Sequence, residues 1–399
     1  MANQNPVNAW DSKLLLVSET TFGTTPTPAD VATYAARAVE FIDASLGPSE
    51  QGGVRDKKDR SLGRGMKSGF VEGRKAPAPI SISLSVKSRS AVDAALKEAV
   101  LYKGAGLKST TNAGTSVVLS MVANPIETAD FASFTAERVQ GSGLAVYEAE
   151  TARGCVVKTL KWEGGDQELK LTASGANNGN KVSRGALESI TVIIGATSLT
   201  HTAEESYRLQ PGYYFCESEV ILVGAVTAGA TSTTITRAQL GTSAAAHTGK
   251  PLQPLLPAGI AFTGSPIAEP VSTVTIDGVA LRALSFSVEL TTGMDHLPGE
   301  TGSAYAQGVK EVRYDVKPSA KLVLHADDVA LLGKATARKV VTVAFSQGTA
   351  GGGRVTFSMP YCELEAVSVP DTIQDVAIVD LGIRCRDNTG NDALTITFD

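Results

Sequence analysis

The stretch Ile80-Ser-Ile-Ser-Leu-Ser-Val86 alternates strictly between apolar residues and serine. A two-residue period is that of a β-strand with one buried face and one polar face. The stretch Leu284-Ser-Phe-Ser-Val-Glu-Leu290 has the same alternation near the other end of the chain. Each belongs to the same order of elements: a strand, a long irregular loop, a second strand and a short helix. The sequence therefore predicts that one β-unit occurs twice.

The two copies consist of corresponding segments. The first copy contains a strand at 39–41, a loop at 47–69, a strand at 80–86 and a helix at 92–102. The second copy contains a strand at 284–290, a loop at 291–308, strands at 312–316 and 321–324, and a helix at 328–336. Corresponding parts lie roughly 240 residues apart, too long a period for a solenoid, which indicates two domains of one type. Residues 123–155 intervene in the first copy, so its later strands are harder to match.

The expected fold class is mainly β with a few short helices, in four segments. These are an N-terminal arm (1–35), a first β-domain (36–185), a small inserted β-module (186–262) and a second β-domain (270–399). In the arm, Pro26 and Pro28 disfavour helix and favour an extended path. Prolines at 251, 254 and 257 predict a stiff linker where the chain leaves the module.

The composition of the 399 residues is that of a globular chain with few aromatic residues. A formal net charge of −5 supplies no basic field that would attract nucleic acid. A weakly acidic surface would instead let a polyanion pass without binding it. No stretch reaches the roughly eighteen apolar residues of a membrane helix, and the first residues lack the pattern of a secretion signal. We therefore expect no membrane association.

The four cysteines, Cys155, Cys216, Cys362 and Cys385, are widely spaced. Metal sites need closely spaced pairs, and disulfide frameworks are normally denser. We therefore expect four buried, reduced thiols in a chain that folds in a reducing cytoplasm. Whether any of them ever pair stays open at this point.

No residue pattern predicts catalysis. The four histidines, at 201, 247, 296 and 325, lie in no Gly-x-Ser-x-Gly elbow and no Cys/His signature. The segment Gly63–Gly69 contains Lys67-Ser68 but lacks the glycine spacing and the following helix of a phosphate loop. We expect neither an enzyme nor a cofactor-binding protein.

Two groups of acidic and histidine residues are candidate metal ligands by type. They are Asp295, His296 and Glu300, and His325, Asp327 and Asp328. Oxygen and imidazole groups at such spacing can bind a metal ion. The first group, however, lies in a Gly-rich loop, and the second is typical of an acidic helix N-terminus. We therefore expect solvated side chains and no metal site.

The strongest charge feature is Arg55-Asp-Lys-Lys-Asp-Arg60. Its aspartates interrupt the positive charge, and no aromatic residues interleave with it, so the segment is poorly suited to nucleic acid. Two interpretations stay open: a solvated, self-neutralising loop, or a connector that pairs with acidic groups of a neighbouring subunit. On the second, the candidate contact residues are Arg55, Lys57, Lys58, Arg60, Arg64, Lys67, Asp295 and Glu300.

Several segments, taken in order, resemble the major tail tube proteins of long-tailed, siphovirus-type bacteriophages. Glu19-Thr-Thr-Phe-Gly-Thr-Thr-Pro26 looks like the arm of such proteins, and the segment from Ile276 to Pro360 resembles their tube domain. Residues 219–247 resemble a small β-module that recurs in phage structural proteins. Because there are two copies, the chain is similar to the subtype with two fused tube-type β-sandwich or barrel domains.

The resemblance implies a structural, non-enzymatic virion protein. Three chains would form a pseudo-hexameric ring, and rings would stack through the loops at 47–69 and 291–308 into the channel for DNA ejection. The implied partners are further copies of the chain, the tape measure protein, the tail terminator and distal tail proteins, with genomic DNA passing without specific binding. Assembly would take place in the host cytoplasm, and the mature location would be the virion tail.

Two other classes remain open. One is another virion component, such as a baseplate hub, tail terminator or decoration protein, which copy number per particle would distinguish from a tube subunit. The other is a β-rich hydrolase, which a cleft with convergent acidic or histidine side chains would favour.

Overall fold

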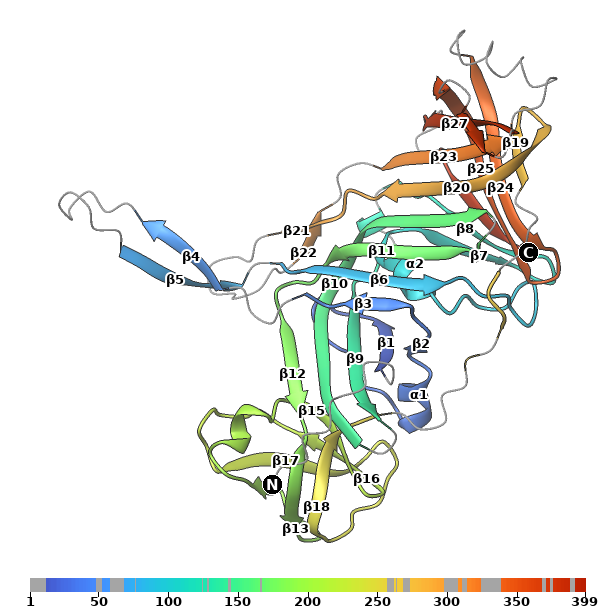
Figure 1. Cartoon of the computed structure of the whole chain (residues 1–399). Coiled ribbons are helices and arrows are strands. Elements are labelled where there is room, and N and C mark those ends of the chain that lie inside the picture. The colour runs from blue at the N-terminus through green and yellow to red at the C-terminus, as the bar shows by residue number, and fades with distance from the viewer. Residues whose placement is uncertain are drawn as a thin grey trace.

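The computed structural model consists mainly of β-strands (Figure 1). It describes residues 12–47, 52–57, 68–75, 77–123, 125–127, 129–142, 145–165, 167–256, 262, 264–267, 273–297, 308–310, 314–323, 339–367, 371–373, 376–387 and 392–399. The α-helices within these ranges are short: α1 (Val31–Ala35) and α2 (Ala99–Gly104). The predicted mainly β fold class is therefore confirmed. None of the helices in these ranges is long and apolar enough to cross a membrane.

Seven strands of the N-terminal half have counterparts, in the same order, in the C-terminal half. The first set is β1 (Ser12–Ser18), β3 (Asp43–Ser45), β6 (Pro79–Ser85), β9 (Phe134–Ser142), β10 (Ala145–Gly165), β11 (Lys170–Ala176) and β12 (Lys181–Gly185). The second set is β19 (Thr273–Ile276), β20 (Val279–Thr291), β23 (Asp315–Val323), β24 (Val340–Thr349), β25 (Gly353–Val367), β27 (Val376–Cys385) and β28 (Thr395–Phe398).

Antiparallel pairing follows one scheme in both sets. The first strand pairs with the fourth, as β1–β9 and β19–β24, and the second with the third, as β3–β6 and β20–β23. The third pairs with the sixth, as β6–β11 and β23–β27. The fifth pairs with the fourth, sixth and seventh, through β10 in one set and β25 in the other. Residues 123–155, which interrupted the sequence match, thus contain β9 and the first half of β10, the counterparts of β24 and β25.

The long strand β10 joins the two units into one sheet. Its second half pairs with β11 on one side and with β20 on the other, from Thr159 opposite Thr291 to Gly165 opposite Ser285. Irregular register around Ala152–Cys155 and Val157–Thr159 bends the strand between its two sets of partners. The result is a continuous strand order β3–β6–β11–β10–β20–β23–β27, visible across the centre of Figure 1.

The second unit closes on itself, and the two units share one core. Strands β20, β19, β24, β25, β27 and β23 pair in a closed cycle, and β25 continues through β28 to β8 (Ser116–Ser120) and β7 (Lys108–Asn112). Trp162 of the first unit packs against Phe357 of the second, with ring centroids 5.5 Å apart. Phe286 contacts both Phe357 and Phe345. The buried Trp162–Phe357 contact therefore adds to the β10–β20 ladder in holding the units together.

The predicted helix at 92–102 was wrong in its extent, because α2 begins only at Ala99. Local propensity in this segment favours helix, but side-chain hydrogen bonds to the backbone hold it in turns. The Asp93 carboxylate accepts from the amide of Gly114, and the Arg89 guanidinium donates to the carbonyl of Ala94. The predicted strand at 39–41 is replaced by β2 (Ala38–Val39) and β3. The predicted helix at 328–336 lies outside the described residues.

Two predicted strands of the second copy, at 312–316 and 321–324, form the single strand β23. Residues 312, 313 and 324 lie outside the described ranges. Pro318 lies opposite Val288 of β20, one residue before the ladder with β27 begins at Ser319.

Most of the N-terminal segment packs on the chain's own first unit. β1 pairs with β9 over its whole length, and Leu14 and Leu16 are buried in the main core. α1 places Tyr34 in a second apolar cluster with Val139 and Val220. Residues 1–11 lie outside the described part of the chain.

Residues between Leu187 and Pro254 form a separate six-stranded sheet. Its strands are β13 (Leu187–Val192), β14 (Ser198–Thr200), β15 (Gly212–Cys216), β16 (Glu219–Val223), β17 (Ser232–Gln239) and β18 (His247–Pro254). It has its own core, which includes Tyr214 and Ile235. Arg184 of β12 binds it to the body, because its guanidinium donates to the carbonyl of Tyr213 and to the carboxylate of Glu137. In Figure 1 this sheet lies at the end of β12, away from the barrel.

Candidate assembly surface

One face of the joined sheet is polar across all its strands. Residues that alternate with the buried positions point to this face, such as Ser83 between Ile82 and Leu84 on β6. Charged residues of opposite sign lie next to each other on neighbouring strands. The opposed pairs are Glu163 with Lys170, Lys161 with Glu289, Glu289 with Lys317, and Lys321 with Asp380. Because the signs alternate, this face carries no extended field of one sign.

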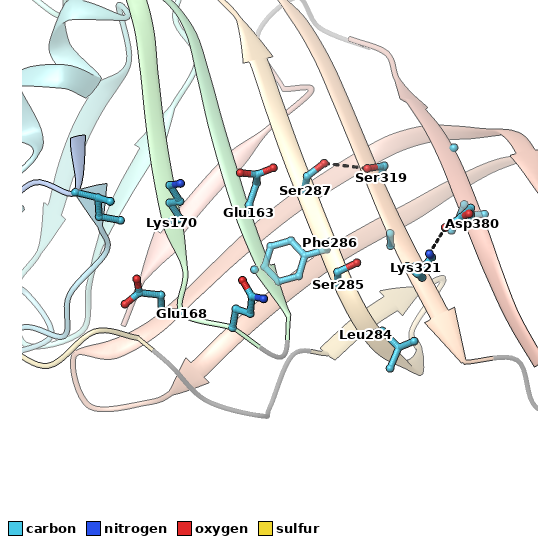
Figure 2. A pocket seen from close by; sticks show the side chains of 16 residues that line it. Glu163, Glu168, Lys170, Leu284, Ser285, Phe286, Ser287, Ser319, Lys321 and Asp380 are labelled. Carbon is cyan, nitrogen blue, oxygen red and sulfur yellow. Dashed lines mark hydrogen bonds and ion pairs between the residues drawn. The ribbon is translucent and has the colours of Figure 1, made fainter. Parts of the chain in front are cut away.

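The polar face is hollowed into an open trough of about 1080 Å³. Figure 2 shows its side chains standing on β10, β11, β20, β23 and β27. The hydroxyls of Ser287 and Ser319 lie 2.9 Å apart, and Lys321 Nζ lies 3.8 Å from Asp380 Oδ1. Glu168 accepts from the Ser85 hydroxyl at 3.0 Å. These three contacts pair polar and oppositely charged groups within the trough or at its rim.

Two strand edges of this sheet have no partner among the described strands. β3 pairs with β6 on one side alone. β25 beyond Glu363, together with β26 (Asp371–Ile373), pairs with β27 on one side alone. The corresponding half of β10 pairs on both sides, with β11 and with β20. Within the chain, β10 pairs with β20. Because β25 corresponds to β10 and β3 corresponds to β20, the open edge of β25 could pair with the open edge of β3 of another chain in the same way.

Ile42, which precedes β3, lies at this open edge. Its side chain is 50% exposed and lines the trough. A large apolar side chain at an unpaired edge favours contact with another chain.

Both long loops leave the joined sheet at the same end of its strands. Ala176 lies opposite both Pro79, where β6 starts, and Val156 of β10. Thr291, where β20 ends, lies opposite Thr159, close to Val156 on the same strand. The loop before β6 contains the hairpin β4 (Gly52–Lys57) and β5 (Ser68–Lys75), and the loop after β20 contains β21 (Asp295–Leu297) and β22 (Gly308–Lys310). Figure 1 shows both hairpins on the same side, with β4–β5 projecting far from the body.

The candidate contact residues fall partly on these hairpins. Arg55 and Lys57 belong to β4, opposite Phe70 and Ser68 of β5. Lys58, Arg60, Arg64, Lys67 and Glu300 lie outside the described residues, as do His325, Asp327 and Asp328. Of the segment Gly63–Gly69, the last two residues are described, and they begin a strand, whereas a phosphate loop leads into a helix.

Asp295 already has a partner within its own chain. Its carboxylate lies 2.7 Å from Lys158 Nζ, and this hydrogen bond lowers the pKa of Asp295, although partial burial opposes the shift. About half of the Asp295 side chain is exposed. A contact between Asp295 and a cation of a neighbouring subunit would therefore have to share the carboxylate with Lys158.

His296 anchors the base of the β21–β22 hairpin. Its Nε2 lies 2.8 Å from the carbonyl oxygen of Gly154 in the bend of β10. A carbonyl can only accept, so Nε2 carries the proton. Nδ1 is buried without a hydrogen-bond partner, and burial lowers the pKa of the imidazole. The residue therefore serves as a neutral structural contact.

Glu19 was not predicted as an important residue, although it begins the arm motif. Its buried carboxylate accepts from the amides of Gly23 and Gly154 and from the hydroxyls of Ser133 and Thr135. Gly23 and Gly154 both have positive φ. The local signal was a glutamate followed four residues later by glycine; its partners on β9 and β10 could not be recognised from the sequence.

The separate sheet contains a buried ionic cluster around Glu219. Its carboxylate accepts from the guanidinium of Arg237, the amides of Ala238 and Ala245, and Nε2 of His247. Burial raises the pKa of Glu219, but these hydrogen bonds outweigh it and lower the pKa from 4.5 to about 2. Each group is bonded within the cluster, which is typical of a structural site. Over the ranges that the structure describes, no three His, Cys, Asp or Glu side chains gather as a possible metal site.

The chain matches no known protein-family model and no curated protein sequence.

Proposed function

We propose that this chain is the tube subunit of a long-tailed bacteriophage tail, and that three copies form a ring of six similar units. The observation that carries the proposal is the β10–β20 junction. This junction joins one β-unit to the next inside the chain. The equivalent strands at the two ends are β25 with β26, which corresponds to β10, and β3, which corresponds to β20. Among the described strands, each of them is paired on one side only.

The two open edges are complementary, which supports head-to-tail association. Pairing of β25–β26 of one chain with β3 of the next would repeat the internal junction between chains. A head-to-tail contact that closes on itself gives a ring and leaves no free edge. Two units per chain and a six-unit ring require three chains.

The polar face of the joined sheet is the proposed wall of the channel. Serines and charge pairs of alternating sign would keep this wall hydrated without a strong field toward a polyanion. DNA could then slide past it without specific binding. The opposite face of the sheet is apolar and occupied by the core.

The β4–β5 and β21–β22 hairpins are the proposed contacts between rings. They leave the sheet at the same end of its strands and would therefore reach the same adjacent ring. The separate sheet lies away from the barrel and would decorate the outside or brace the joint between units. Tape measure, terminator and distal tail proteins would be the further partners, and the virion tail the location.

Negative-stain microscopy of the concentrated full-length protein tests the proposal. We expect rings with six similar lobes and stacks of such rings. A monomer that never polymerises at high concentration, even with tail-tip components, would refute it. A copy number of only a few per particle would instead favour a hub or terminator.

A further inference from the structure

Cys362 and Cys385, though separated in the sequence, lie directly opposite each other on β25 and β27. Their sulfur atoms are 3.0 Å apart. Cys362 is buried, and Cys385 is partly exposed at the end of β27. The expectation of four buried thiols was therefore wrong for Cys385, and the two residues form a dithiol with one side open to solvent.

Their surroundings favour a cross-link over any other role for the pair. The two Cα atoms belong to one ladder pair, which holds them within the range that a disulfide spans. Cys155 and Cys216 are buried, and their strand partners are Phe134 and Glu219 rather than another cysteine. The 362–385 pair is the one that the strand register places face to face.

We propose that Cys362 and Cys385 are a disulfide-forming site that closes when the protein meets a disulfide oxidant, such as oxidised glutathione. The Cys385 thiolate attacks one sulfur of the oxidant, forms a mixed disulfide and releases one glutathione thiolate. Cys362 then loses its proton and attacks the Cys385 sulfur, which releases the second glutathione. Overall, two protein thiols are oxidised to one disulfide and one glutathione disulfide is reduced to two glutathione thiols.

The bond would link β27 to β25 at the point where β25 loses its second neighbour, β24, and its open edge begins. That edge begins after Glu363, the residue next to Cys362. In a reducing cytoplasm the pair would stay open during folding, and after release into an oxidising medium it would lock this part of the barrel. The reaction will be slow at neutral pH, because contact with Cys362 and burial raise the pKa of the Cys385 thiol.

The test is to incubate the purified full-length protein with oxidised glutathione at pH 8.5, denature it, block the remaining thiols and map the peptides by mass spectrometry. We expect one disulfide between Cys362 and Cys385, with Cys155 and Cys216 blocked as free thiols. Four free thiols, a lasting glutathione adduct on Cys385, or pairing with Cys155 or Cys216 would overturn the proposal.

Variants separate this site from general oxidation. Cys385→Ser changes the partly exposed member and should fold, as circular dichroism can verify. Oxidation should raise the melting temperature of the wild type by several degrees, reversibly on reduction, and leave Cys385→Ser unchanged. The Cys155→Ser/Cys216→Ser double variant should keep the full shift. A shift that survives in Cys385→Ser would contradict the assignment.

Discussion

The Nε2–H group of His296 donates a hydrogen bond of 2.8 Å to the carbonyl of Gly154, and so ties the loop after β20 to the bend of β10. The amide of the same Gly154 donates to Glu19 at 2.9 Å. One glycine thus connects the N-terminal segment, the strand that joins the units and the second long loop. A side chain at this position would collide with Asn178, which lies 2.8 Å from the ideal Cβ site, and the positive φ adds strain.

We expect His296→Gln to reduce the acid sensitivity of the fold. Burial lowers the pKa of His296 below its ordinary 6.5, and the hydrogen bond to the Gly154 carbonyl opposes this shift in part; the smaller effects of Lys158 and Asp295 have opposite signs. As pH falls below about 6.5, the unfolded chain takes up this proton before the folded chain does, so stability falls with pH. Glutamine can still donate to Gly154 but does not titrate. Urea unfolding at pH 7.5 and 5.0 should show a smaller loss for His296→Gln than for wild type; equal losses would contradict the assignment.

Replacement of Glu19 by glutamine should destabilise the fold by about 2 kcal/mol. Each Glu19 oxygen accepts from one backbone amide and one hydroxyl, so in either orientation the glutamine NH₂ group would face an amide that can only donate. Denaturant unfolding measures the change. Glu168→Gln is the matched control, because Glu168 is exposed and has one described hydrogen bond, and it should change stability by less than about 0.5 kcal/mol.

Glu219→Gln should cost about 3 kcal/mol at pH 7, because it leaves the buried Arg237 without its ionic partner. The lowered pKa of the Glu219 carboxyl gives a second test. Stability from this carboxylate is present above pH 4.5 and is lost as pH falls toward 2, so the variant should lack that part of the acid transition. Hydrogen exchange in β16–β18 at pH 7 and pH 3 reports on both effects. Glu217→Gln, at a half-exposed partner of His247, should have a much smaller effect; a similar one would argue against this role for Glu219.

Ile42→Glu should prevent ring closure without unfolding the chain. The side chain is half-exposed, so the monomer tolerates the change, but at a chain-to-chain junction a buried carboxylate would be unpaired. Size-exclusion chromatography with light scattering should find monomers where the wild type forms trimers. Ile193→Glu, 72% exposed on the separate sheet, is the control and should leave assembly intact. Normal trimers of Ile42→Glu would rule out the β3 edge as the junction.

Charge reversal in the first hairpin should block stacking and spare the rings. If the basic hairpin pairs with acidic groups of the adjacent ring, Arg55, Lys57 and Lys58 changed together to Glu would repel those groups. Electron microscopy should show single rings in place of tubes. Lys108→Glu, on exposed β7, should give tubes of normal length. Tubes of normal length in the triple variant would eliminate the hairpin as the stacking contact.

Local sequence patterns predicted the repeated alternating strands and the serine-bearing face. They could not predict the helix boundary at Ala99, because Asp93 in the preceding segment accepts a hydrogen bond from Gly114, a residue outside that segment. Nor could they reveal the partner of Asp295, because Lys158 lies far away in the chain. The basic loop could be recognised from its composition. Its position at the same end of the strands as the second long loop depends on the cross-strand register, which the sequence does not reveal.

By itself, the sequence determined the mainly β fold class, because the two-residue alternation seen in β6 and β20 follows directly from strand geometry. Tertiary structure alone decided that β10 joins the two units into one sheet, and that β3 and β25 keep open edges in the described chain. The physical reason is that periodicity is local, whereas the partner of a strand depends on long-range chain closure and on the shared core around Trp162 and Phe357.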